Sequence, residues 1–232
     1  MHIEPGVVDG AKIVLSYGTA AAAFGLTALM ARQDARAEAQ RGGWPALLAR
    51  SLLTTLAVFC FFEVFPHEPV GVSEVHLILG STLLLLFGAG ATGIGLALGL
   101  LAQGLLFAPN DLPQYAMNVT TLLVPLYAIH QLARRIIPAH TAYVDIQYRQ
   151  ALMLSLAYQG GIVLWVAFWA LYGHGVGADT LAEVGSFGVA YMGVVLLEPL
   201  IDLGALWLAK TLAGLTRGRL FAARLHAAGT PA

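Results

Sequence analysis

Long apolar segments alternate with short polar connections along this chain. Apolar runs occupy residues 10–31, 46–65, 75–88, 90–107, 115–137, 150–172 and 184–209. A transmembrane helix needs about 20 mostly apolar residues, so the pattern predicts an all-α polytopic membrane protein with about seven transmembrane helices. The third run has only about 14 residues, and we expect it to be re-entrant or tightly coupled to the fourth through a turn at residues 88–90.

Composition supports a membrane protein. The chain has 232 residues, of which 58% are hydrophobic and 11% charged, whereas soluble domains carry about 25% charged residues. The net charge of −1, without a basic patch beyond the helix ends, argues against a nucleic-acid partner. We expect one transmembrane domain at residues 1–215, a cytoplasmic tail at 216–232, and a lipid bilayer around the helices.

Basic residues predict the orientation. They gather in alternate connections, namely Arg32, Arg36, Arg41, Arg50, Arg134, Arg135, Arg149, Lys210, Arg217, Arg219 and Arg224. The connections at 63–75, 108–114 and 173–183 contain neither Lys nor Arg, and Lys12 alone departs from the pattern. The positive-inside rule then places the C-terminus in the cytoplasm and the N-terminus outside, as seven spans require.

Acidic residues fall mainly in the outward segments, at Glu4, Asp9, Glu68, Glu74, Asp111, Asp179 and Glu183. An acidic mouth would concentrate cations near the outer face. The alternative is an ordinary set of solvated outer loops without basic residues. The sequence leaves both interpretations open.

The first two residues form a metal chelator in their own right. The amine of Met1, the amide nitrogen of His2 and its ring Nδ1 can close on one ion. A second histidine would complete a planar set of four nitrogens, which suits Ni(II) or Cu(II) better than tetrahedral Zn(II). Pro5-Gly6 can fold these residues back between the helices.

Three outward histidines are candidates for the fourth donor, whereas His130, His140 and His226 map to the cytoplasmic half. His76 is expected at the start of the third helix, with Ser73 as its N-cap, where a rigid backbone favours a demanding geometry. His67 and Glu68 lie in a loop and, with Glu74, can contact the metal or line its approach. His174 stands between two glycines in an expected mobile loop.

Three blocks of sequence resemble a known family. They are Met1-His2-Ile3 with Pro5-Gly6; Phe65-Pro66, Pro69, Gly71, Ser73, His76-Leu77 and Gly80; and Gln103-Gly104-Leu105-Leu106-Phe107 with Asn118. Together they resemble the cobalt/nickel-specific membrane components of energy-coupling-factor ABC transporters. The loop at Val70-Gly71-Val72-Ser73 departs from that family's pattern and has one extra residue before His76.

The resemblance implies a seven-helix fold whose N-terminus inserts into the bundle. It implies Ni²⁺ or Co²⁺ as the bound substrate, held by Met1, His2 and His76, with Asn118 as a supporting polar residue. A transmembrane coupling subunit and ABC ATPases would be the partners, in a bacterial cytoplasmic (inner) membrane. The chain itself has no Walker sequence, so it is predicted to be a transporter component rather than an enzyme.

Two further features concern the inside of the bundle. Gly95 and Gly99 form a GxxxG pattern, which we expect to serve internal packing. Glu198 and Asp202 are four residues apart and share a helix face. Asp202 is expected near solvent, whereas Glu198 lies deeper and would pair with an arginine, or bind a proton in a proton-coupled role.

Two alternatives to metal import remain. The first is an intramembrane metal-dependent hydrolase that uses His67, Glu68 and His76. Such an enzyme would need an open coordination position for water, which a closed plane of four nitrogens does not offer. The second is a non-transporting membrane protein that keeps the fold without the metal site.

Overall fold

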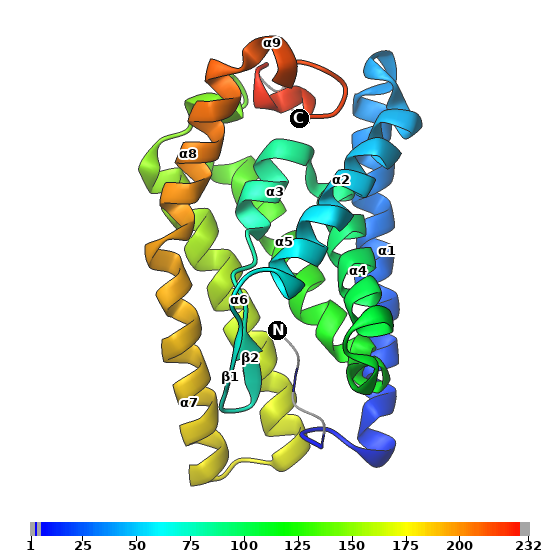
Figure 1. Ribbon diagram of the computed structural model, residues 1–232, viewed down its shortest axis with the longest axis vertical. Coiled ribbons are helices and arrows are strands. Elements are labelled where there is room, and N and C mark those ends of the chain that lie inside the picture. Colours follow the sequence, from blue (N-terminus) through cyan, green and yellow to red (C-terminus); the bar gives the residue numbers. More distant parts are fainter. Residues whose placement is uncertain (1–2, 4–5, 228–232) are drawn as a thin grey trace.

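A computed structural model describes residue 3 and residues 6–227 (Figure 1). The helices are α1 Val14–Ala37, α2 Gly43–Glu63, α3 Gly80–Phe87, α4 Ala89–Leu106, α5 Tyr115–Ile136, α6 Tyr148–His174, α7 Ala178–Met192, α8 Glu198–Thr211 and α9 Ala213–Thr216. The strands are β1 Glu68–Val70 and β2 Ser73–Val75. Short 3₁₀ turns include η1 Gly10–Ile13, η4 Tyr143–Asp145 and η5 Gly193–Leu196.

The predicted helical, multi-pass architecture is confirmed. Five helical segments are long and apolar enough to cross a bilayer, namely Gly10–Ala37, Gly43–Glu63, Ala89–Leu106, Tyr148–His174 and Ala178–Thr211. Helix α5 is 22 residues long but lies among α1, α4 and α6, with most of its surface buried. A helix covered by protein does not need an apolar surface all round. The number of spans and the sidedness of the two ends stay predictions.

The prediction of a third helix at residues 75–88 was wrong for the first half of that range. Residues 73–75 form β2, residues 76–79 continue without helical structure, and α3 begins only at Gly80. Strand β2 pairs with β1 and also bridges to Ile3, so partners on both sides occupy backbone groups that a helix would use. Ser73 is therefore a strand residue and not an N-cap. The expected turn before α4 is confirmed, with Gly88 at φ +88°.

The last predicted helix, at 184–209, is interrupted. Helix α7 ends at Met192, the η5 turn follows, and α8 starts at Glu198. Pro199 occupies the first turn of α8, where its missing N–H costs nothing, but its ring excludes a regular helix through the preceding turn. The break places Glu198 at a helix start inside the bundle.

Helix α4 lies beside α2 (Figure 1), and glycines on α4 allow the close approach. A Cβ at Gly95 would lie 2.2 Å from Thr54 Oγ1, and one at Gly99 would lie 2.6 Å from Val58 Cγ1. Thr54 Oγ1 also donates to the carbonyl of Ala91 at 2.8 Å. The GxxxG pattern therefore serves internal packing, as predicted.

The two ends of the bundle differ in their cover. The end that carries the β1–β2 hairpin is called the hairpin end, and the end that carries α9 is called the tail end (Figure 1). At the tail end the segment after α9 folds back onto the bundle. Ala222 N donates to Leu86 O at 2.8 Å, and Ala223 N donates to Glu38 Oε1 at 3.0 Å. The basic connections between α1 and α2 and between α5 and α6 lie at this same end.

Candidate metal centre

The hairpin is held in place by one glycine. Strands β1 and β2 pair antiparallel, with Glu68 opposite Val75 and Val70 opposite Ser73. Gly71 turns between them at φ +61°, and a Cβ there would lie 2.3 Å from the carbonyl oxygen of Glu183 in α7. Both the left-handed backbone and the close approach demand glycine. The turn therefore locks the hairpin against α7.

His76 is the buried histidine of this region, with 1% of its surface exposed. Its Nε2 lies 2.9 Å from Glu74 Oε2, and its ring meets the edge of Phe62 at a centroid distance of 4.9 Å. The expectation of a helical His76 was wrong, because the residue directly follows β2. Its backbone is nevertheless restrained by the paired strand before it, so the side chain is held in one place.

His67 packs directly on His76. The two rings stack with centroids 4.9 Å apart and planes 17° from parallel, and His67 is exposed. The structure thus brings together both histidines that the sequence singled out at this end. Glu68 is exposed on β1, whereas His174 ends helix α6 on the surface rather than lying in a loop.

The N-terminal segment enters the bundle beside this hairpin. Ile3 is 1% exposed, forms an antiparallel bridge with Ser73, and donates its N–H to Asn118 Oδ1 at 2.9 Å. Asn118 is itself buried on α5. Gly6, at φ +97°, turns the chain just after this segment. Asn118 therefore anchors the chain at the third residue.

The predicted donors Met1 and His2 lie outside the described residues. Within the described ranges, no group of three or more His, Cys, Asp or Glu side chains is arranged to hold a metal ion. His76, Glu74 and His67 are the metal-binding residue types that meet at the hairpin. The chelate with the N-terminus stays a prediction.

Two residues that the sequence did not single out bear on this region. Phe62, near the end of α2, is fully buried against His76. Gln159, on α6, donates to the carbonyl of Ile78, two residues after His76, at 3.1 Å. Neither carries a sequence signal, since Phe62 is one of many aromatics in an apolar run and Gln159 is one polar residue inside a span.

Glu198 and Asp202 lie away from the hairpin, where α8 meets α3 and α6. Both are 0% exposed, so the expectation of a solvated Asp202 was wrong. Ser81 and Thr82, at the start of α3, contact its two carboxyl oxygens in place of solvent. Glu198 contacts Ser81, Ser155 and Gln159, and among the described residues it has no arginine partner.

Comparison with known families shows to which family the chain belongs. No significant match to the chain was found among curated proteins or among solved structures. A sequence model of one family, described as the cobalt uptake substrate-specific transmembrane region (CbiM), matches residues 2–213. That match covers nearly the whole chain, including the hairpin, Asn118 and the acid pair. The chain therefore belongs to the family of cobalt uptake substrate-specific transmembrane regions.

Proposed function

We propose that this membrane component of cobalt uptake captures a divalent transition metal, Co²⁺ or Ni²⁺, at the hairpin end. The metal is the transported substrate. Its donors are the Met1 amine, the amide and ring nitrogens of His2, and His76. The observation that carries the proposal is the anchoring of Ile3 between Asn118 and Ser73. The alternative of a fold retained without a metal site gives no role to this buried anchor.

Chain length limits where the first two donors can be. A residue of extended chain spans at most about 3.6 Å, so the Met1 amine lies within about 8 Å of the Ile3 nitrogen. Ser73, the bridge partner of Ile3, is three residues before His76. A chelate of the first two residues is therefore within reach of the His76 ring.

Glu74 gives His76 a defined ring orientation. A carboxylate on one imidazole nitrogen is a common device that fixes the tautomer of a metal-binding histidine and raises its basicity. Because Nε2 of His76 faces Glu74 Oε2 at 2.9 Å, Nδ1 is the nitrogen that would bind the metal. Four nitrogens in a plane suit a d⁸ Ni(II) centre and also accept Co(II).

The stacking of the two histidines favours His76 over His67 as a donor and disfavours the hydrolase alternative. The lone pairs of an imidazole lie in its ring plane, and these planes are 17° from parallel with centroids 4.9 Å apart. One ion cannot lie in both planes at bonding distance in this arrangement. His67 and Glu68 are instead exposed contacts along the approach of the metal.

Uptake needs an energy source, and this sequence contains no Walker sequence for ATP binding. We propose that a transmembrane coupling subunit and ABC ATPases supply it, in a bacterial cytoplasmic membrane, with the hairpin end outside. The basic connections gathered at the tail end support this orientation. Labelling of single introduced cysteines at residues 38 and 69 from the outside of cells tests the sidedness, since only position 69 should react.

Calorimetry on purified protein tests the chelate. A short histidine-free tag on the Met1 amine should abolish high-affinity Co²⁺ and Ni²⁺ binding, because it removes the free amine from the chelate ring. The same tag at the C-terminus is the matched control. Circular dichroism should show unchanged helices in both. Equal metal affinities for the two proteins would refute the chelate.

A further inference from the structure

Glu198 and Asp202 form an enclosed polar cluster inside the bundle. Ser81 Oγ lies 2.9 Å from Glu198 Oε1 and 2.8 Å from Asp202 Oδ2, so one hydroxyl bridges the two acids. Thr82 Oγ1 donates to the other oxygen of Asp202. Ser155 Oγ and Gln159 Nε2 donate to Glu198 Oε2 at 2.5 Å and 2.7 Å.

The cluster has one hydrogen too few. Five contacts reach the two carboxyl groups, but a hydroxyl has a single proton, so Ser81 can donate to only one of its two acidic neighbours. The other short contact then needs a hydrogen on a carboxyl group. A proton on either acid completes the network, because the Ser81 oxygen accepts from one carboxyl group while its hydrogen goes to the other.

A second observation comes from Gln159. Its amide faces the pair through Nε2, and the residue is 0% exposed. Its Oε1 has no hydrogen-bond partner in the described part of the chain. The buried hydroxyls of Tyr158 and Tyr191 also have no partner in that part of the chain, so they donate to neither acid, and the pair lacks a hydrogen. Such a site attracts a positive charge.

Within the described part of the chain, no basic side chain supplies that charge, because no Lys, Arg or His there contacts either acid. Of the titratable groups on the elements around α8, Tyr158 of α6 and Tyr191 of α7 are fully buried, and Tyr143 of η4 is buried. The others are exposed, namely Tyr148, Arg149, Tyr172 and His174 of α6, Asp179 and Glu183 of α7, and Asp145 of η4. Lys210, further along α8, binds Asp145 at 2.6 Å. Two ionised acids without a positive partner are strongly disfavoured in the membrane interior.

We propose that Glu198 and Asp202 share one proton and form a proton-binding pair inside the membrane. One carboxylate takes up H⁺ and becomes a carboxylic acid that donates to Ser81, and the other stays ionised. Ser81, Thr82, Ser155 and Gln159 stabilise the remaining negative charge. On release, the same O–H bond breaks and the proton leaves through water.

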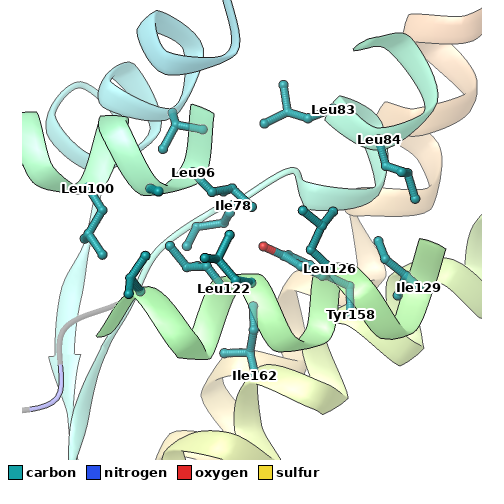
Figure 2. Close-up of a cluster of buried hydrophobic side chains, with 14 of the residues drawn as sticks. Ile78, Leu83, Leu84, Leu96, Leu100, Leu122, Leu126, Ile129, Tyr158 and Ile162 are labelled. Carbon is teal, nitrogen blue, oxygen red and sulfur yellow. The ribbon is translucent and has the colours of Figure 1, made fainter. Parts of the chain in front are cut away.

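The pair also positions the segment that carries His76. Gln159 Nε2 donates both to Glu198 and to the carbonyl of Ile78. Figure 2 shows the Ile78 side chain in the buried apolar cluster with Leu96, Leu122 and Leu126. Ser81 follows at the start of α3. Loss of the proton would leave two repelling charges beside Gln159, which links Glu198 to the carbonyl of Ile78. We expect this repulsion to loosen residues 76–82. The proton-binding pair does not depend on the proposed function. Only a use of this pair in metal transport would rest on that function.

Infrared titration of metal-free protein tests the shared proton, because only a protonated acid has the carboxylic C=O band. The wild type should show this band at neutral pH, and Glu198→Gln and Asp202→Asn should each abolish it. Asp145→Asn, an exposed acid on η4, is the control and should leave the band intact. Ser81→Ala keeps both acids and should shift the band, since its hydrogen bond is lost.

Three results would overturn the proposal. The first is a wild-type spectrum without the band. The second is a band that each single variant only halves, because that means two independently protonated acids. The third is a band that appears only when Na⁺ is removed, because that assigns the site to a metal cation. Circular dichroism must show folded helices in every variant compared.

Hydrogen exchange tests the positioning role. Raising the pH until the infrared band disappears should speed exchange of residues 76–82 in the wild type by about tenfold beyond the intrinsic pH effect. Glu198→Gln has the same charge as the proton-bound pair and should suppress that increase. Equal pH dependence in both proteins would mean that the pair does not hold this segment. Neither experiment uses metal, so failure of the chelate would not affect them.

Discussion

The cluster around His76 and the acid pair on α8 are both buried, but their surroundings differ. His76 has a carboxylate, two aromatic rings and the incoming N-terminal segment around it. The acid pair is enclosed by hydroxyl and amide donors from α3 and α6. The first region is open to a chain end and an exposed imidazole, as a site that takes up an ion requires. The second is closed, as a site for a proton can be.

The largest expected effect separates the two histidines of the hairpin. His76→Ala should weaken Ni²⁺ binding by about 100-fold or more, because water must replace one of four nitrogens. His67→Ala is the matched control and should change affinity by less than about threefold. Calorimetry gives the affinities, and the yellow-to-orange diamagnetic Ni(II) spectrum reports the planar geometry. The reverse ranking would assign the donor to His67.

The second effect tests whether the hairpin and the acid pair are independent. Gly71→Ala places a Cβ 2.3 Å from Glu183 O at φ +61°, which should destabilise the hairpin by about 1–3 kcal/mol. Co²⁺ affinity should fall, while the infrared band of the acid pair stays. Gly185→Ala, in α7 with open space around it, is the control. Loss of both signals in Gly71→Ala would show that the regions are not separable.

The third effect concerns the anchor of the N-terminal segment. Asn118→Ala removes the acceptor of the Ile3 N–H, and we expect about a 10-fold loss of Co²⁺ affinity with unchanged helix content. Asn110→Ala, an exposed asparagine in the preceding connection, should bind as the wild type does. An unchanged affinity for Asn118→Ala would mean that the bridge to Ser73 alone positions the N-terminus.

The smallest expected effect is a pH dependence of the docking of the tail. It should leave both the His76 cluster and the acid pair unchanged. Burial, followed by Arg217 and Arg41, lowers the pKa of His226 below its ordinary value, and its Nε2 lies 2.7 Å from Thr216 Oγ1. The unfolded tail therefore binds a proton more readily than the docked tail. Docking is fully stable above about pH 6.5 and weakens as pH falls below it.

Limited proteolysis after α9 measures this docking. Cleavage should increase on acidification in the wild type and lose its pH dependence in His226→Asn. His140→Asn is the control, because His140 is an exposed histidine of another connection at the same end. Equal pH dependence in wild type and His226→Asn would assign the effect to another group.

Prediction from sequence succeeded where a local pattern decides the structure. The ranges of α2, α4, α5 and α6 followed from runs of apolar residues to within about three residues, and the glycine turn at residue 88 followed from its spacing. Helix α1 was predicted as well, but it begins four residues later and ends six residues later than its apolar run. It failed at residues 75–79, where apolar residues form a strand and its extension instead of a helix. The partners that decide this, β1 and Ile3, come from distant parts of the sequence.

The candidate site shows the same division. His67, His76, Glu74 and Asn118 could be named from residue type and resemblance, and the structure brings them to one end of the bundle. The parallel stacking of the histidines and the edge contact of Phe62 could not be predicted. They depend on where the hairpin packs, which Gly71 and the carbonyl of Glu183 determine.

The sequence by itself determined that this is a helical membrane protein with its basic residues at one end, because hydropathy and charge act through the bilayer wherever the chain folds. It also named the candidate metal donors, whose role stays a prediction. Only the tertiary structure decided that Asp202 is buried and shares a hydroxyl with Glu198. A four-residue spacing aligns two acids on a helix, but α3, more than 110 residues earlier, supplies the serine that bridges them.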